Sequence, residues 1–274
     1  MRAYILGVPD RYRGQSLEAQ LSQIGFPFAV VDAPDASAWP PGFLETVYSR
    51  RAAQIVSHRR LSPGEVACVL GHRSMMASLV ETGDDWALFL EDDAIVTGKL
   101  DPIMAVLGSI PDGPTVIDLD NRRPPSTGSP RAVPNQGGTL SPQPVPGVGT
   151  AAYLMNRSAA LTALRAYRRR RVDSTADWPF CWSRSVRFWQ PDTEVVRHPT
   201  IVTESLVAVG RQRSYRNTHR RGRASSIAVG VLQLVGIAAL YGRVHNIPLI
   251  PIYRRDLREG QARLTAAAWR ARPR

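Results

Sequence analysis

Cysteine is scarce in this sequence of 274 residues. Only Cys68 and Cys181 are present, far apart and outside any Cys-x-x-Cys pair. Neither a disulfide framework nor a structural zinc site is therefore expected, and a reducing cytoplasm fits best. The first residues also lack the long apolar stretch and the small-residue cleavage site of a signal peptide. They are instead typical of a buried first strand.

Long hydrophobic runs are scarce as well. Residues 224–241 are apolar except for Ser225, Ser226 and Gln233, which leaves them slightly short of the ~20 apolar residues that a membrane-spanning helix needs. Six arginines stand just before this stretch: Arg211, Arg213, Arg216, Arg220, Arg221 and Arg223. An interfacial membrane helix and a helix packed on the domain both have this pattern, so both interpretations stay open.

Lysine is nearly absent, and positive charge is unevenly spread. The formal net charge is +12, yet residues 1–203 are almost neutral, whereas residues 204–274 hold fourteen arginines against three acidic residues. We therefore expect a main domain over residues 1–205 and a basic helical extension over residues 206–274. Such an extension binds anions, for example an anionic membrane face, the phosphates of a lipid-linked substrate or nucleic acid, unless it is a solvated tail. The expected location is the cytoplasm, with peripheral attachment to the inner membrane face.

Apolar runs and helical patterns alternate along the main domain. Residues 4–8 and 28–31 have the composition of buried strands, and Leu17, Leu21 and Ile24 recur between them at helical spacing. This order predicts a parallel strand pair with a right-handed crossover. Further strands are expected over residues 86–90, 115–119 and 149–155, and further helices over residues 62–81, 100–107 and 158–167. The sequence thus predicts an α/β fold with an open, mostly parallel, twisted sheet flanked by helices.

Two segments lack this alternation. Residues 34–60 are rich in Pro and Arg and are expected to be irregular, and residues 121–147 are dense in Pro, Gly and Ser. A loop as long as the second one is often a functional flap or lid. The helix that follows the first segment has a strong start, because Ser62 can cap it, Pro63 suits its first position and Glu65 completes a capping box.

Three consecutive acidic residues follow the expected strand at residues 86–90. Glu91, Asp92 and Asp93 repel one another at the end of a buried strand unless a divalent cation balances them. Mg²⁺ and Mn²⁺ prefer carboxylate and phosphate oxygens, and open α/β sheets bind ligands beyond the carboxyl ends of their strands. In an extended segment Glu91 and Asp93 point to the same side, so these two are the expected metal ligands. A metal there would bind a nucleotide diphosphate and stabilise it as a leaving group. An exposed acidic turn is the alternative interpretation.

Two motifs at a specific spacing resemble glycosyltransferase family 25, which includes lipooligosaccharide galactosyl- and glucosyltransferases and the collagen galactosyltransferases. That family pairs a Leu-Ser-x-Gly-Glu-x-Gly-Cys helix, ending in Ser-His, with a strand that runs into Glu-Asp-Asp. The corresponding segments here are residues 61–72 (LSPGEVACVLGH) and residues 88–94 (LFLEDDA). The similarity extends over roughly residues 1–205 and includes residues 4–21, Val31-Asp32-Ala33, residues 149–154 and Asp177-Trp178-Pro179.

The resemblance implies a GT-A-like fold, a UDP-sugar donor and, typically, inversion at the anomeric carbon. The reaction would move a hexose, galactose or glucose, to a saccharide or lipid-linked saccharide acceptor in surface glycan or lipooligosaccharide assembly. Mn²⁺ or Mg²⁺ is the implied cofactor, bound by Glu91 and Asp93. The implied donor-binding residues are Glu91, Asp92, Asp93, Arg11, Arg13, Asp32 and His72.

Some of these side chains have a plain structural alternative. Arg11 and Arg13 suit a phosphate because arginine binds it with two donors, but a solvated turn also contains such residues. His72 could contact a phosphate or the metal region, or it could be a buried, hydrogen-bonded helix histidine. An inverting transfer needs a general base, for which Asp177 is the first candidate and Asp173 the second. The alternative for each aspartate is a helix cap or a salt bridge to the arginines at residues 168–171.

Departures from the family pattern keep other functions open. Gly7, Ala67 and Gly71 stand where the family usually has Asn, Gly and Ser, so a degenerate protein that only binds saccharide is one alternative. Nucleic-acid binding is disfavoured because the main domain is nearly neutral and aromatic residues do not interleave with the arginine clusters. A metal-dependent phosphohydrolase would need further acids and histidines at strand ends, where only Asp118 and Asp120 qualify.

Overall fold

A computed structural model of the chain describes residues 1–57, 59–98, 100–120, 133–135, 138–143, 149–168 and 170–197. The expected basic extension and its apolar stretch at residues 224–241 lie outside these residues, as does most of the loop at residues 121–147. Among the helices that the structure describes, none is long and apolar enough to span a membrane.

The fold is built on an eight-stranded sheet with the order β2-β1-β3-β8-β5-β9-β7-β6. A separate two-stranded sheet pairs β10 with β4. The strands are β1 Arg2–Gly7, β2 Phe28–Asp32, β3 Trp86–Glu91, β4 Ile95–Val96, β5 Thr115–Asp118, β6 Val133–Asn135, β7 Gly138–Gln143, β8 Ala152–Asn156, β9 Arg187–Pro191 and β10 Val196–Arg197. The α-helices are α1 Gln15–Gln23, α2 Phe43–Val47, α3 Arg50–Val56, α4 Pro63–Thr82, α5 Asp101–Ala105, α6 Arg157–Tyr167 and α7 Phe180–Ser183. Short 3-10 helices are η1 Pro9–Arg11, η2 Ala36–Ala38 and η3 Leu107–Ser109.

The α/β class is confirmed, but the sheet is mixed rather than mostly parallel. β1 is parallel to β2 and β3, and β5 is parallel to β9. β8 is antiparallel to both β3 and β5, and β7 is antiparallel to β6 and β9. The sequence does not reveal that β8 is antiparallel to its neighbours, because a strand buried on both faces is an apolar run whichever way it points.

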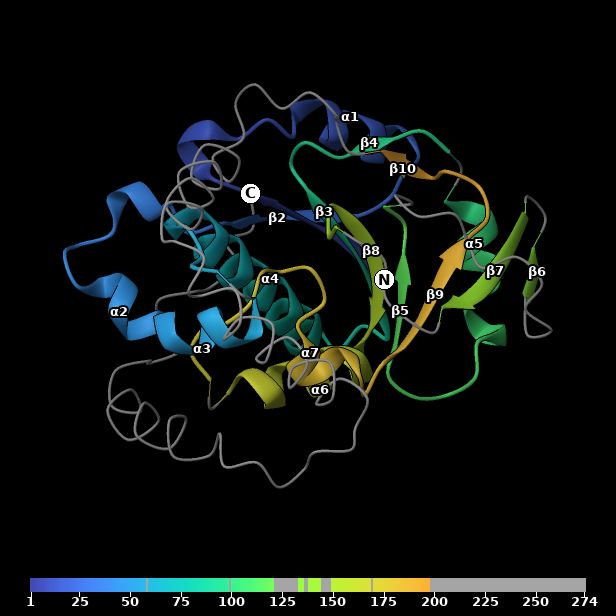
Figure 1. The fold of residues 1–274 in the computed structure, drawn as a ribbon. Helices are drawn as coiled ribbons and strands as arrows, with labels where there is room; N and C mark the ends of the chain where they lie inside the picture. Colours follow the sequence, from blue (N-terminus) through green and yellow to red (C-terminus); the bar gives the residue numbers. More distant parts are fainter. Residues whose placement is uncertain are drawn as a thin grey trace, which may run out of the picture.

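Helices cover both faces of the sheet (Figure 1). Alternate side chains of the central strands enter two different cores, as the pleat of a strand requires. Ile5 and Leu90 face the core that also contains side chains of α1 and α5, whereas Leu6 and Phe89 face the core shared with α4, α6 and α7. A third, smaller cluster joins α2 and α3 to the start of α4.

Two segments that were expected to lack regular structure contain short elements. α2 and α3 lie within residues 34–60, and the hairpin β6–β7 lies within residues 121–147. Helices of one or two turns show no long apolar period, because tertiary packing rather than a repeating face stabilises them. β6 contains Pro134 and is the last strand of the sheet, a position where proline removes no central ladder bond.

The capping box at the start of α4 is confirmed. The Ser62 hydroxyl accepts from the Glu65 backbone N–H, and the Glu65 carboxylate accepts from the Ser62 backbone N–H at 2.9 Å. Arg59 also donates to this carboxylate, which is buried. The helix ends at Gly83 with a φ of 74°, which favours glycine. These end signals fix the helix that carries Cys68 and His72.

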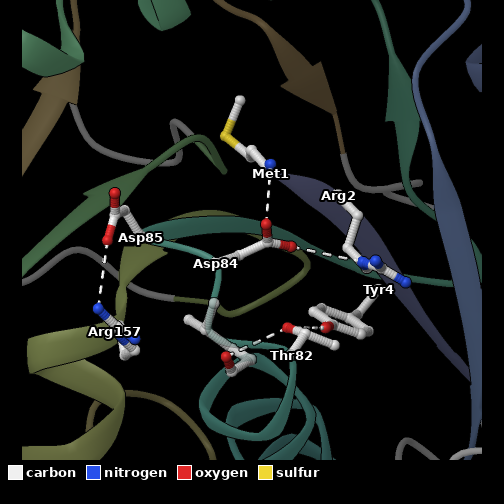
Figure 2. A network of polar contacts seen from close by, with 8 residues as sticks. Met1, Arg2, Tyr4, Thr82, Asp84, Asp85 and Arg157 are labelled. Carbon is white, nitrogen blue, oxygen red and sulfur yellow. Dashed lines mark hydrogen bonds and ion pairs between the residues drawn. The ribbon is translucent and has the colours of Figure 1, made fainter.

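Polar contacts hold the amino ends of β1 and β3 together (Figure 2). The acidic run lies at the other end of β3. Asp84, in the turn between α4 and β3, accepts from the Met1 ammonium and the Arg2 guanidinium. The Tyr4 hydroxyl is hydrogen-bonded to Thr82 at the end of α4. These contacts join the end of α4 to the amino ends of β1 and β3, while the backbone ladder between β1 and β3 sets which residues meet at the carboxyl ends.

Candidate functional site

The carboxyl ends of β1, β2 and β3 lie side by side. Leu6 is in register with Glu91, and the Asp92 backbone N–H donates to the Leu6 carbonyl at 3.0 Å. Gly7 is in register with Asp32 at the end of β2. The acidic run, the loop after β1 and Asp32 therefore meet at one edge of the sheet, where open α/β sheets bind ligands.

The chain turns sharply within the acidic run. The Ala94 N–H donates to the Glu91 carbonyl at 3.0 Å, and Asp92 and Asp93 are the central residues of this turn. The expectation that Glu91 and Asp93 face one side depended on extended backbone, and it does not apply beyond Glu91. The turn instead separates Glu91 from the next two carboxylates and gives them different neighbours.

Asp92 and Asp93 converge on Arg13, which follows η1 in the loop after β1. Arg13 Nη2 lies 3.0 Å from Asp92 Oδ1 and 3.2 Å from Asp93 Oδ2. The Arg13 backbone N–H also donates to Asp92 Oδ2 at 3.0 Å. Burial acts to lower the pKa of the Arg13 guanidinium, but the hydrogen bond and charge of Asp92 and the charge of Asp93 outweigh it and raise that pKa. One positive group thus lies between two carboxylates at the sheet edge.

Glu91 points instead toward α4 and the loop before β8. His72 Nε2 lies 3.3 Å from Glu91 Oε1, and the Thr150 hydroxyl donates to the same oxygen at 3.2 Å. His72 Nδ1 lies 2.9 Å from the Tyr153 hydroxyl, and burial raises the pKa of that phenol well above its ordinary value. His72 is 4% exposed, so it is a buried, hydrogen-bonded helix histidine that contacts the acidic run through Glu91.

Cys68 completes this group. Its sulfur, a ring nitrogen of His72 and a carboxylate oxygen of Glu91 all lie within 4.8 Å of one another. Within the described ranges, no other set of three or more His, Cys, Asp or Glu residues meets that criterion. The sequence did not predict this grouping, although the spacing of Cys68 and His72, four residues apart on one helix, was a signal for it.

Arg11 and Asp32 lie near the same edge but have different neighbours. Asp32 is exposed at the end of β2. Arg11 is the last residue of η1. The pKa of Asp35 is lowered chiefly by hydrogen bonds from Ser37, and the charge of Arg11 makes a smaller contribution in the same direction. Arg13 rather than Arg11 therefore makes the contacts with Asp92 and Asp93 described above.

The two candidate bases lie in different surroundings. Asp173 is 6% exposed, its Oδ1 accepts from Ser174, and its charge helps to raise the pKa of the Cys181 thiol to about 11, an increase that burial dominates. Asp177 is exposed. Its neighbour Trp178 has a φ of 47°, and the Trp178 N–H donates to the Ala176 carbonyl at 2.6 Å, so the backbone is tightly turned around Asp177.

The Trp178 ring links this turn to the interior of the site. It packs edge-on against Tyr153 with ring centroids 5.1 Å apart, and Tyr153 stacks on His72 at 5.7 Å. Asp177 is therefore next to a row of packed rings, Trp178, Tyr153 and His72, and His72 contacts Glu91. A left-handed backbone at a bulky residue is costly and is often found at functional sites.

Packing explains two of the departures from the family pattern. A Cβ on Gly7 would lie 2.3 Å from the Tyr12 ring, and a Cβ on Gly71 would lie 2.7 Å from a methyl group of Leu6. Glycine at these positions lets Tyr12 fold back over the end of β1 and lets α4 approach β1 closely. Both departures thus have a structural reason, and neither changes the acidic run.

Asp118 and Asp120 also lie at this edge, across the start of β8 from the acidic run. The Glu91 N–H donates to the Ala151 carbonyl, and the Leu119 N–H donates to the Ala152 carbonyl. Both aspartates are 2% exposed, and Asp118 Oδ1 accepts from the Asp120 N–H at 3.1 Å. Within the described part of the chain, they belong to no group of three potential metal ligands.

Comparisons with known proteins identify the first part of the chain. Residues 2–123 match the model of glycosyltransferase family 25 (LPS biosynthesis protein). A "crystal structure of a glycosyltransferase involved in the glycosylation of the major capsid of PBCV-1" aligns with 78% of this chain and 98% of that chain, at 14% identity and a TM-score of 0.36. That similarity is too low to support an inference, and no curated protein matches the chain.

The matched region contains the loop after β1, the capped helix α4 and the acidic run, which are the parts that meet at the carboxyl edge of the sheet. The candidate bases lie beyond it. Residues 2–123 are therefore a domain of glycosyltransferase family 25, the family of LPS biosynthesis proteins.

Proposed function

We propose that this protein transfers a hexose, galactose or glucose, from a UDP-sugar to a saccharide or lipid-linked saccharide acceptor in surface glycan assembly. The observation that carries the proposal is the convergence of Asp92 and Asp93 on Arg13 at the carboxyl edge of a family 25 domain. We extend the catalytic domain to residues 1–205 and assign it a GT-A-like mode of donor binding, with Asp32 and Arg11 near the same edge as further donor contacts.

The donor diphosphate would lie against the turn at Asp92 and Asp93. Arg13 offers it a planar, permanently charged group that can bind two phosphate oxygens at once. Because Arg13 is half-exposed while Asp92 and Asp93 are mostly covered, the guanidinium can swing from the carboxylates to a phosphate without unpacking the core. The backbone N–H of Arg13 would keep its bond to Asp92 and hold the loop in place.

The two carboxylates also fit a hard divalent cation. Carboxylate oxygens are the ligands that Mn²⁺ and Mg²⁺ prefer, and Arg13 shows that a positive group is accommodated between them. We propose Asp93, together with Asp92, as the metal-binding pair, while Glu91 stays engaged with His72 and Thr150. When bound, the metal supplies positive charge that stabilises the diphosphate as a leaving group.

Asp177 is the proposed general base for the acceptor hydroxyl. It is exposed, whereas Asp173 is buried beside Ser174, and an acceptor must reach the base. Its carboxylate would take the proton from the acceptor hydroxyl.

A donor screen tests the transferase proposal. The full-length protein is incubated with a panel of nucleotide sugars, with Mn²⁺ or with EDTA, and release of nucleoside diphosphate is measured. Turnover of a UDP-hexose that depends on the metal is expected. If no nucleotide sugar is bound or turned over, the proposal fails and a degenerate, saccharide-binding protein becomes the better interpretation.

Three substitutions test the assigned roles. Asp177→Asn should lower kcat/KM by about 100-fold or more, the range of general-base catalysis, with donor binding unchanged. Asp173→Asn serves as the matched control and should retain most activity if it folds. Unchanged turnover in Asp177→Asn would remove the base assignment, and unchanged metal dependence in Asp93→Asn would remove the metal assignment.

The basic extension at residues 206–274 is proposed to bring the enzyme to an anionic membrane face where a lipid-linked acceptor resides. Sedimentation with vesicles that contain anionic lipid tests this proposal. Truncation after Gly210 should abolish binding that the full chain shows at low salt. Equal sedimentation of the two proteins would contradict a membrane role for the extension.

A further inference from the structure

Cys68, His72 and Glu91 form a mixed cluster of sulfur, nitrogen and oxygen ligands beside the donor site. Cys68 and His72 are four residues apart on α4, so their side chains lie one above the other on the same helix face. Glu91 comes from the end of β3, on a different element. All three potential ligand atoms lie within 4.8 Å of one another, which we call the Cys–His–Glu cluster.

The spacing suits a tetrahedral ion. Two ligands bound at about 2.0–2.1 Å with a tetrahedral angle are about 3.3 Å apart, and a sulfur bound at about 2.3 Å lies about 3.6 Å from such a ligand. His72 Nε2 and Glu91 Oε1 are 3.3 Å apart. Since every ligand pair is within 4.8 Å, shifts of about 1 Å in side-chain position suffice for the sulfur to join them.

Neighbouring groups orient the ligands in the way that metal sites require. A metal-binding histidine usually bonds through its second ring nitrogen to a fixed partner, and metal-binding carboxylates are hydrogen-bonded as well. The Tyr153 hydroxyl lies 2.9 Å from His72 Nδ1, which leaves Nε2 facing Glu91. Thr150 donates to Glu91 Oε1. The hydrogen bonds with Tyr153 and Thr150 thus hold the His72 ring and the Glu91 carboxylate in position.

We infer that the Cys–His–Glu cluster binds a borderline-soft divalent cation, with Zn²⁺ as the best fit. A thiolate and an imidazole favour zinc over Mg²⁺ or Mn²⁺, which prefer all-oxygen sites such as Asp92 and Asp93. Three protein ligands leave a fourth position for water, and the Glu91 side chain, 26% exposed, provides the path of entry. Such an ion would tie the end of β3 to α4 and fix the turn on which Asp92 and Asp93 stand.

The chain offers an internal control for this inference. Cys181 is the only other cysteine, and its electrostatic neighbours include Asp173, Arg170 and Arg73 rather than a histidine. Two arginines make that site unsuitable for a cation. Among the residues that the structure describes, Cys68 belongs to a group of three potential ligands and Cys181 does not.

Cobalt provides the test, because Co²⁺ replaces Zn²⁺ and gives a near-ultraviolet charge-transfer band when a thiolate binds it. Full-length protein is stripped with a chelator and titrated with Co²⁺. A band that saturates at one ion per chain is expected for the wild type, for Cys181→Ser and for Asp93→Asn, and its loss is expected for Cys68→Ser. His72→Ala or Tyr153→Phe should weaken Co²⁺ binding by about 10-fold or more.

Absence of the band in the wild type, or its persistence in Cys68→Ser, would overturn the inference. A second measurement needs no variant: Zn²⁺ should protect the Cys68 peptide from alkylation, and Mg²⁺ should not, with the products mapped by mass spectrometry. Equal alkylation with and without Zn²⁺ would also overturn it. None of these readouts depends on turnover, so a failure of the proposed transferase activity remains distinguishable.

Discussion

Replacing Arg13 with glutamine should strengthen the binding of Mn²⁺ to Asp92 and Asp93. The guanidinium makes ion pairs of 3.0 and 3.2 Å with the two carboxylates, and its side chain is 42% exposed. A pair with this much solvent contact contributes up to ~1 kcal/mol, so we assign about 1 kcal/mol to the two together. Mn²⁺ has to displace the guanidinium from the two carboxylates in order to bind. Without the guanidinium, the binding free energy should be more favourable by about 1 kcal/mol, which corresponds to an increase in affinity of about fivefold.

Isothermal titration of Mn²⁺ into the protein, without nucleotide, measures this change. Arg13→Gln is the informative variant because it keeps the backbone N–H that donates to Asp92. Arg11→Gln removes an arginine two residues away and serves as the matched control, since Arg11 lies near Asp35 instead. We expect tighter Mn²⁺ binding in Arg13→Gln, no change in Arg11→Gln, and loss of binding in Asp93→Asn.

The same substitution should weaken nucleotide binding. If Arg13 moves to the donor diphosphate when the metal arrives, Arg13→Gln loses a charge-assisted contact of roughly 1.5–3 kcal/mol, or about 10- to 100-fold in UDP affinity. Opposite signs for Mn²⁺ and UDP are the signature of one side chain shared between two sites. Unchanged or weaker Mn²⁺ binding in Arg13→Gln would refute the idea that the guanidinium occupies the cation position.

Three further predictions concern a capping box, a buried thiol and a closely packed glycine. Glu65→Ala should lower the free energy of unfolding by about 3 kcal/mol in urea denaturation, because it leaves Arg59 without its carboxylate and removes half of the capping box; a loss below ~1 kcal/mol would contradict this. The Cys181 thiol, with its pKa raised to about 11 chiefly by burial, stays protonated at neutral pH, so its alkylation rate should rise about tenfold per pH unit up to that pKa. A rate that levels off near pH 8–9, about the pKa of a free thiol, would contradict the shift. Gly7→Ala should be destabilising, since the added methyl would lie 2.3 Å from the Tyr12 ring, and an unaltered melting temperature would show that the ring has room to move.

Local signals in the sequence predicted much of the architecture. Helix ends are marked by the capping box at Ser62 and Glu65 and by the glycine after α1. Both signals involve residues close together in the sequence, so they can be recognised without the structure. The parallel pairing of β1 and β2 follows from a short crossover and is confirmed. The position of the acidic run at the end of β3 is likewise a local property of an apolar strand.

The remaining features depend on contacts between distant residues. β8 runs antiparallel to β3 and β5, and the composition of an apolar strand does not reveal this direction. The convergence of Arg13 on Asp92 requires that β1 and β3 be neighbours, a fact that no motif states. Tyr153 was noted only as part of a family strand, and its hydrogen bond to His72 joins residues 81 positions apart.

The turn within the acidic run changes the reason for having three acids in a row. On extended backbone their mutual repulsion seemed to require a metal, because like charges at the end of a buried strand are costly. In the folded protein the turn divides them: Arg13 pairs with both Asp92 and Asp93 at the edge and offsets one of their two charges, while Thr150 and His72 contact Glu91 inside. The turn thus places Asp92 and Asp93 at the proposed donor site and Glu91 beside Cys68 and His72.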